Sequence, residues 1–134
     1  MTNVLIADDD AAICKVLRLM LEDAGYHTQS TSDGRATLEV LRRDPQPLIA
    51  LIDIKMPKLD GLSIMRIATR QSFQRLGHPR AFILMTAYTE SASDPIEADL
   101  TQLHAQRLQK PFDEADVVNA VTQAAEQLEQ QGCE

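Results

Sequence analysis

The chain has 134 residues, of which 44% are hydrophobic and 25% are charged, and its formal net charge is −7. This length and composition suit one globular domain and exclude a disordered chain. The acidic balance argues against unaided binding to nucleic acid or to an anionic membrane surface, because both favour a basic face.

The sequence also predicts a protein that stays out of the membrane and in a reducing compartment. The longest apolar runs have about five residues, so no segment is expected to span a bilayer. The chain starts directly with a strand pattern and shows no signal peptide. Its two cysteines, Cys14 and Cys133, form no disulfide or metal-binding pattern, so a cytoplasmic location is expected.

Strand-like and helix-like segments alternate five times along the chain. The strands are expected at residues 4–7, 26–31, 48–52, 81–85 and 106–110. Gly25 ends the first helix, Asp60 and Gly61 open the third, and Asp94 starts the fourth. Asp113 caps the last helix. The residues of that helix expected to face inward are Val117, Val118, Val121, Ala125 and Leu128.

This alternation indicates a parallel sheet with helices on both faces. The strands at 26–31 and 106–110 are polar, whereas the other three are apolar throughout. Edge strands are less buried than interior ones, so the polar strands should lie at the two edges. With right-handed crossovers the strand order becomes 2-1-3-4-5. We therefore predict an α/β fold, a flavodoxin-like (βα)5 three-layer sandwich.

Polar residues stand at the carboxyl ends of four predicted strands, the edge where open parallel sheets bind ligands. These residues are Asp8, Asp9, Asp53, Thr86 and Lys110. The first and third strands are predicted neighbours, about 5 Å apart, so three carboxylates should converge there. Their mutual repulsion calls for a hard divalent cation, and Mg²⁺ suits best because it takes few carboxylates and keeps positions for phosphate oxygens.

Asp53 directly follows a run of apolar residues, and the surrounding groups predict that it accepts a phosphoryl group. A metal, a lysine and a hydroxyl around a carboxylate nucleophile are typical of phosphoryl-transfer sites. Without those neighbours the simpler interpretation would be favoured, in which Asp53 ends a strand and accepts hydrogen bonds from loop amides.

These segments together resemble the receiver domain of two-component response regulators, of the chemotaxis-regulator kind. The matching stretches are residues 4–10 (VLIADDD), 51–61 (LIDIKMPKLDG), 83–87 (ILMTA) and 110–112 (KPF). They stand in family order at nearly family spacing. We expect the receiver domain to comprise residues 1–128, followed by a polar tail at 129–134.

The resemblance implies that Asp53 is the phospho-acceptor. Asp8 and Asp9 would hold Mg²⁺, with Asp53 and the backbone carbonyl of Lys55 as further ligands. The donor would be a phosphohistidine on a sensor histidine kinase or a phosphotransfer protein.

The resemblance also implies that Thr86 and Lys110 contact the phosphate, and that the bond from Lys110 to Pro111 is a candidate cis peptide. Phosphorylation would switch the face formed by the fourth helix, the fifth strand and the fifth helix. A downstream output protein would bind this face, which is also a candidate for homodimerisation. The chain would be a phosphorelay signalling domain and not an enzyme, apart from assisting its own phosphorylation and dephosphorylation.

The chain departs from the family on the output side. Arg107 stands where receivers carry Tyr or Phe, which puts the coupling of that position to Thr86 in question. Lys55 and Tyr88 occupy the two positions that, in the family that the chain resembles, control water access to the phosphate. A long Lys and a ring could shield the phosphate there, so we expect slow autodephosphorylation.

Other functions fit less well. A small Mg²⁺-dependent phosphohydrolase of the haloacid dehalogenase type would carry a second Asp two residues after Asp53, but Lys55 stands there. A flavodoxin-like ligand-binding module or a pseudo-receiver fits less well, because no phosphate-cradling Ser/Thr/Gly loop follows the first strand and the set of acidic residues is complete. A receiver cut from a longer multidomain regulator would look identical to a stand-alone one. Because few residues follow Leu128, we expect this chain to signal through another protein.

Overall fold

The computed structural model describes residues 2–56, 58, 60, 61, 63, 64, 66, 67, 79–86, 101 and 104–130. The strands are β1 (Asn3–Ala7), β2 (His27–Thr31), β3 (Leu48–Asp53), β4 (Arg80–Thr86) and β5 (Gln106–Gln109). The helices with defined bounds are α1 (Ala11–Asp23), α2 (Gly34–Arg43) and α5 (Glu114–Gln130). Residues 61, 63, 64, 66 and 67 are also helical, and the start of the fourth helix expected at Asp94 lies outside the described residues.

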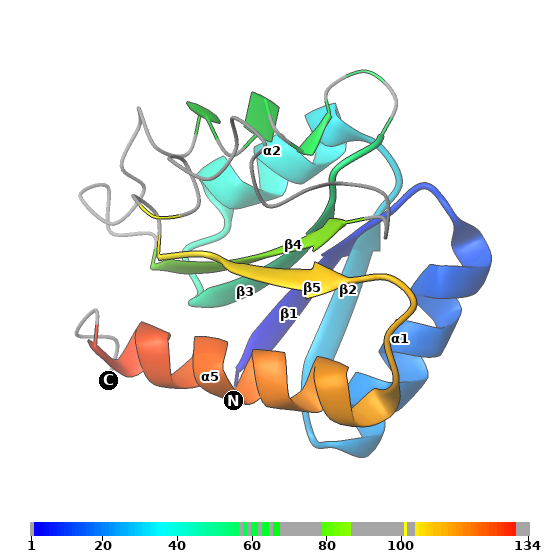
Figure 1. The fold of residues 1–134 in the computed structure, drawn as a ribbon. Helices are drawn as coiled ribbons and strands as arrows, with labels where there is room; N and C mark the ends of the chain where they lie inside the picture. The colour runs from blue at the N-terminus through cyan, green and yellow to red at the C-terminus, as the bar shows by residue number, and fades with distance from the viewer. Residues whose placement is uncertain are drawn as a thin grey trace.

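All five strands run parallel in the order β2-β1-β3-β4-β5, which confirms the predicted fold and strand order. The helices α1 and α5 cover one face of the sheet and α2 covers the other (Figure 1). The strand bounds differ slightly from those predicted, since β2 starts at His27 and β4 starts at Arg80.

The burial of each strand matches its place in the sheet. Every residue of β3 and β4 is buried, whereas β2 has none that is fully buried and β5 has only Leu108. Interior strands of a parallel sheet are covered on both faces, so apolar residues fill them between their ends. This is why strand composition alone could indicate the two edges.

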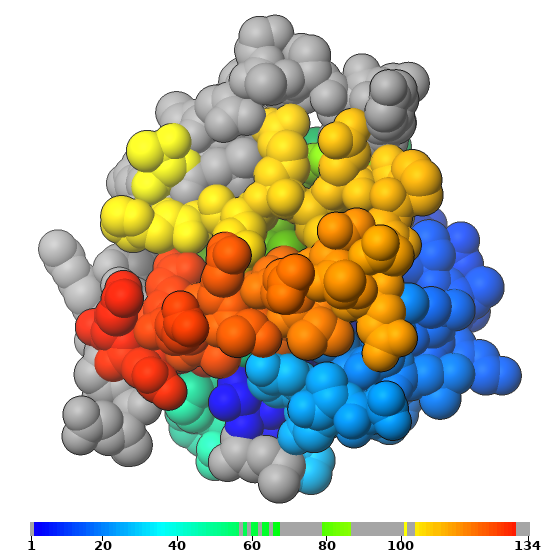
Figure 2. All heavy atoms as spheres, turned by 60° about the horizontal axis from the view of Figure 1, so that its bottom comes forward, coloured from blue at the N-terminus to red at the C-terminus, as the bar shows by residue number. Residues whose placement is uncertain are grey.

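The helix α5 buries a stripe that is rotated from the one predicted. In α5 the residues Val117, Val121 and Leu128 are buried as predicted, but Val118 and Ala125 are only partly buried. Ala120 and Ala124 complete the buried stripe, because residues three and four apart share one side of a helix. Figure 2 shows α5 crossing the molecule between residues of β5 and residues of α1.

The loops that leave the carboxyl ends of the strands are fixed by helix caps. Asp10 accepts hydrogen bonds from the amides of Ala12 and Ile13 and so begins α1. The Asp60 carboxylate accepts a hydrogen bond from the Ser63 amide at 2.7 Å.

Gly25 follows α1 with a φ of 95°, a left-handed conformation that glycine adopts without steric cost. None of the helices in the described part of the chain is long and apolar enough to cross a membrane.

Candidate functional site

Three aspartates converge at the carboxyl ends of β1 and β3. In the register of these strands Ala7 pairs with Ile52, so Asp8 and Asp53 follow side by side. Carboxylate oxygens of Asp8, Asp9 and Asp53 all lie within 4.8 Å of one another. Asp8 is 1% exposed and Asp53 is 8% exposed, whereas Asp9 is exposed. The structure thus brings together the three acids that the strand order predicts to be neighbours.

Lys110 reaches this acidic cluster from the end of β5. Its ammonium nitrogen lies 3.2 Å from an oxygen of Asp8 and 3.4 Å from an oxygen of Asp53. Its amide donates to the Thr86 carbonyl oxygen at 2.8 Å, and its bond to Pro111 is cis, as predicted. One ammonium faces three carboxylates, so the ionised cluster keeps a formal charge of −2.

The pKa values of the cluster reflect this imbalance. Burial raises the pKa of Asp53 and the neighbouring charge of Asp8 raises it further, while Lys110 opposes both. Burial alone would lower the pKa of Lys110, but the carboxylates of Asp53 and Asp8 outweigh it and the pKa is raised. The folded chain therefore holds Lys110 charged and resists a further negative charge on Asp53. An additional cation would relieve this resistance.

The donor set fits Mg²⁺. Hard divalent cations take oxygen ligands, and Mg²⁺ is held by one or two carboxylates together with water and phosphate oxygens. Asp8 is oriented by a hydrogen bond that it accepts from the Asp10 amide at 2.9 Å. The amide of Lys55 donates to the Asp53 carboxylate, which places the start of the loop after β3 at the cluster. Asp8, Asp9 and Asp53 are therefore the residues that could hold the ion.

Thr86 ends β4, the strand next to β3, and is 2% exposed. It shares this edge of the sheet with Asp53, because the Ile54 amide donates to the Met85 carbonyl oxygen. Arg107 lies on β5, beside Leu84 in the sheet register, and lines a groove between β5 and α5. Tyr88, the second position expected to control water access, lies outside the described residues.

Gly61 has a role at the site that the sequence did not reveal. A Cβ atom at this position would lie 2.5 Å from the Asp53 carbonyl oxygen and 2.9 Å from the Ile54 Cα atom. The Gly61 amide also donates to the Ile54 carbonyl oxygen at 3.0 Å. The Asp60-Gly61 pair signalled a helix start, but only the folded chain shows that the helix packs directly on the backbone of Asp53.

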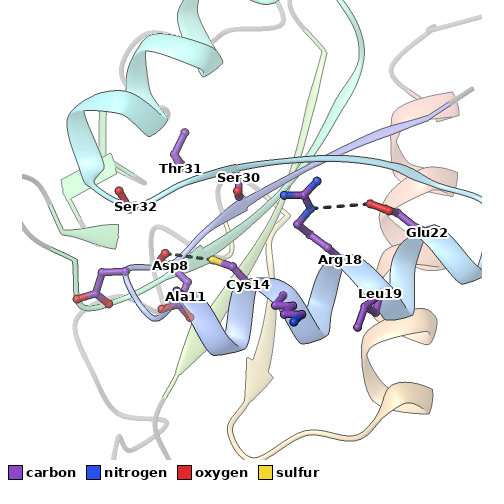
Figure 3. A pocket seen from close by; sticks show the side chains of 11 residues that line it. Asp8, Ala11, Cys14, Arg18, Leu19, Glu22, Ser30, Thr31 and Ser32 are labelled. Carbon is purple, nitrogen blue, oxygen red and sulfur yellow. Dashed lines mark hydrogen bonds and ion pairs between the residues drawn. The ribbon is translucent and has the colours of Figure 1, made fainter.

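A cavity of about 550 Å³ adjoins the acidic cluster between α1 and β2. Figure 3 shows Asp8 at one end of it and Arg18, paired with Glu22, at the other. The Cys14 thiol lies between them and donates to the Asp8 carbonyl oxygen at 3.2 Å. Burial raises the pKa of Cys14, and the charges of Asp8 and Asp10 raise it further. Cys14 is therefore held as a neutral thiol that supports the Asp8 backbone.

Comparisons with known proteins agree with this geometry. A family model described as the response regulator receiver domain matches residues 4–122. The response regulator receiver protein CpdR of Brucella abortus is 32% identical over 121 residues, which are 90% of this chain and 94% of that protein. The response regulator MprA of Mycolicibacterium vanbaalenii is also 32% identical, but over 82% of this chain and 44% of that protein.

Solved structures show the same fold. A CheY-like receiver domain from Methanospirillum hungatei has a TM-score of 0.79 and 25% identity, covering 96% of this chain and 98% of that one. The receiver domain of Francisella response regulator 1452 has a TM-score of 0.78 and 26% identity, covering 95% and 98%. The chain belongs to the response regulator receiver family and is a receiver domain of two-component signalling.

Proposed function

We propose that Asp53 is the residue of this receiver domain that accepts the phosphoryl group. The observation that carries the proposal is the position of the Asp53 carboxylate, which is buried beside Asp8 and lies 3.4 Å from the Lys110 ammonium. Asp9, by contrast, is exposed, and Asp8 is more deeply buried than Asp53, with 1% against 8% of its surface exposed.

The transfer exchanges one phosphorus bond for another. A carboxylate oxygen of Asp53 attacks phosphorus in line, and the bond from phosphorus to the donor's imidazole nitrogen breaks. The electron pair of the broken bond stays on that nitrogen, so the donor histidine is restored. We propose a phosphohistidine of a sensor histidine kinase or a phosphotransfer protein as this donor.

The neighbours of Asp53 divide the remaining work. Asp8, Asp9, Asp53 and the Lys55 carbonyl would hold Mg²⁺, which when bound neutralises and orients the phosphoryl oxygens. Lys110 pairs with a phosphate oxygen, and its place between Asp8 and Asp53 supports this role. Thr86, at the same edge of the sheet, donates a hydrogen bond from its hydroxyl to a phosphate oxygen.

The acyl phosphate that forms changes the charge of a buried site and so biases the domain between two conformations. The responding surface is the one built from the fourth helix, β5 and α5, which binds a downstream output protein or a second copy of the chain. The groove between β5 and α5, with Arg107 in its wall, supports an output surface there. The position of Lys55 two residues after Asp53 supports shielding of the phosphate and slow autodephosphorylation.

The chain acts as a signalling domain and not as an enzyme on other substrates. It works in the cytoplasm, without direct contact with nucleic acid or membrane. The receiver domain comprises residues 1–128, consistent with Leu128 being the last buried residue of α5, and residues 129–134 form a polar tail.

The test is the intact mass of the protein after incubation with acetyl phosphate. A gain of about 80 Da, the mass of one phosphoryl group, should require Mg²⁺ and disappear in Asp53→Asn. The matched control is Asp10→Asn, two residues beyond Asp8, which keeps the α1 cap and should still gain the mass. An unchanged gain in Asp53→Asn would place the acceptor elsewhere.

A further inference from the structure

An ion pair joins the two loops on either side of β1. The Lys58 ammonium, in the loop after β3, lies 3.5 Å from a carboxylate oxygen of Asp33, in the turn after β2. Because β1 pairs with both β2 and β3, Ala7 lies between Thr31 and Ile52. The pair therefore spans the carboxyl end of β1, where Asp8 and Asp9 stand.

Asp33 is a firm anchor for this pair. Its carboxylate caps α2 by accepting a hydrogen bond from the Ala36 amide at 2.8 Å, and its carbonyl oxygen accepts one from the buried Thr37 hydroxyl. The Ala36 amide and the charge of Lys58 hold the pKa of Asp33 below its usual value, so it stays ionised at neutral pH. Only the Lys58 side chain must become ordered to form the pair, which limits the entropic cost.

The loop that carries Lys58 also carries Lys55 and is fixed at its two ends. The Ile54 amide donates to the Met85 carbonyl oxygen, and the Gly61 amide donates to the Ile54 carbonyl oxygen. Between these points Lys58 has a φ of 70°, a left-handed conformation uncommon outside glycine. The backbone here is bent at some cost, and the bend lies where the side chain reaches Asp33.

We propose that the Lys58–Asp33 pair positions the loop after β3 and thereby sets the affinity of the site for Mg²⁺. Both are positioning residues, and the inference rests on the Mg²⁺ site of the proposed function. The loop presents Lys55 to the cluster, so freeing the loop adds an ordering cost to metal binding and weakens it.

Simple charge effects predict a different outcome, which makes the proposal testable. Acting only through space, Lys58 repels a bound cation and its removal would strengthen Mg²⁺ binding, whereas loss of the Asp33 charge would weaken it. Positioning by the pair predicts that both losses weaken binding. It also predicts that the second loss adds little once the first has occurred.

The experiment is calorimetric Mg²⁺ titration of the full chain as Asp33→Asn, Lys58→Gln and the double variant. Asn keeps an acceptor for the α2 cap, so this variant removes the charge and not the cap. Each single change should weaken Mg²⁺ binding by about two- to five-fold, the range expected for one partly exposed ion pair. The double variant should bind Mg²⁺ about as weakly as the single variant with the lower affinity. Lys58→Arg keeps the positive charge and should retain most of the wild-type affinity for Mg²⁺.

A matched control is the pair of Glu39 and Arg43 on α2, an exposed ion pair within one helix. Glu39→Gln and Arg43→Gln should leave Mg²⁺ affinity unchanged. Tighter binding in Lys58→Gln would overturn positioning in favour of simple charge effects. Additive losses in the double variant would also overturn it, because the two residues would then act independently and not as a pair.

Amide hydrogen exchange of the metal-free protein gives a second readout, independent of the metal. Exchange at Lys55, Met56 and Lys58 should be faster in both single variants than in wild type, and unchanged exchange would overturn the proposal. If wild type bound no Mg²⁺, the proposed metal site would fail, while the exchange measurement would still decide whether the pair holds the loop.

Discussion

The sheet carries a buried charged centre at each end, and the two centres differ in how completely their charges are satisfied. At the carboxyl end, Asp8 and Asp53 share the single ammonium of Lys110. At the other end, Arg80 opens β4 and is 2% exposed. Each of its five N–H groups donates to a backbone carbonyl oxygen. The acceptors are those of Leu41, Asp44, Gln46 and Pro79.

The difference teaches that a buried charge alone does not mark a functional site. Every donor of the Arg80 guanidinium already has an acceptor, so this centre has no use for a ligand. It ties the end of α2 and the loop after it to β4. The acidic cluster has more negative than positive charge, and burial holds the pKa of Asp53 above its usual value. The incomplete centre is the one whose charge a cation would balance, in keeping with the phosphoryl transfer that we propose there.

The largest expected effect comes from removing the guanidinium of Arg80. Arg80→Met removes five hydrogen bonds to four backbone carbonyl oxygens, and at about 1 kcal/mol for each bond it should lower the free energy of unfolding by about 3–5 kcal/mol. Urea denaturation measures the loss. Arg80→Lys, with three N–H groups in place of five, should fall between Met and wild type. Loss of less than 1 kcal/mol in Arg80→Met, roughly one ordinary hydrogen bond, would contradict a structural role.

The next largest effect is expected at Gly61, which packs against the backbone of Asp53. Gly61→Ala places a methyl group 2.5 Å from the Asp53 carbonyl oxygen, so it should cost about 1–3 kcal/mol and slow phosphorylation. The control is Gly25→Ala, where the added Cβ atom would meet nothing within 4 Å but φ is 95°. It should cost about 1–2 kcal/mol through backbone strain and leave the phosphorylation rate unchanged. Equal phosphorylation rates in both variants would contradict close packing on Asp53 as the reason for Gly61.

A smaller effect separates adjacent acids of the first loop. Asp10→Ala removes the α1 cap and should cost about 1 kcal/mol, measured by thermal unfolding. Its effect on Mg²⁺ affinity should be minor, because Asp10 lies outside the group of converging carboxylates. Asp9→Asn should show the reverse pattern, with weaker Mg²⁺ binding and little change in stability. A large loss of Mg²⁺ affinity in Asp10→Ala would contradict this separation between a helix cap at Asp10 and metal binding at Asp9.

The smallest expected change in stability is a gain. Because burial and the charge of Asp8 raise the pKa of Asp53, the folded chain keeps this proton to higher pH than the unfolded chain. The stabilisation is present at low pH and is lost as the pH rises through the raised pKa. Asp53→Asn should therefore melt slightly higher than metal-free wild type at pH 7 and match it in acid. A lower melting temperature at pH 7 would show that Lys110 outweighs burial.

Strand order and the acidic cluster were both predictable because each follows from a local pattern. The polar composition of His27–Thr31 and Gln106–Gln109 marks edge strands, and the edge assignment then places Asp8 beside Asp53. Burial of a strand depends on its position in the sheet, and its composition depends on its burial. The composition of the strands therefore indicates their order in the sheet.

Contacts between loops could not be predicted in the same way. A charged residue before an apolar run indicates the end of a strand, yet Arg80 is buried because carbonyl groups from another segment surround it. The partners Asp33 and Lys58 are 25 positions apart, and neither position has a pattern that points to the other. Val16 is apolar but 46% exposed, because it lies beside the stripe of α1 that holds Leu17 and Leu21.

The hydrogen bond between Lys110 and Asp8 joins residues 102 positions apart, and this has a consequence for the newly made protein. At a synthesis rate of about 5–20 residues per second, Lys110 leaves the ribosome about 5–20 s after Asp8. During that interval the strands β1 and β3 exist in the chain, but the only ammonium seen against their carboxylates in the described structure does not. If Lys110 supports phosphoryl transfer as we propose, a nascent chain gains this support for Asp53 only after β5 and Lys110 have been made.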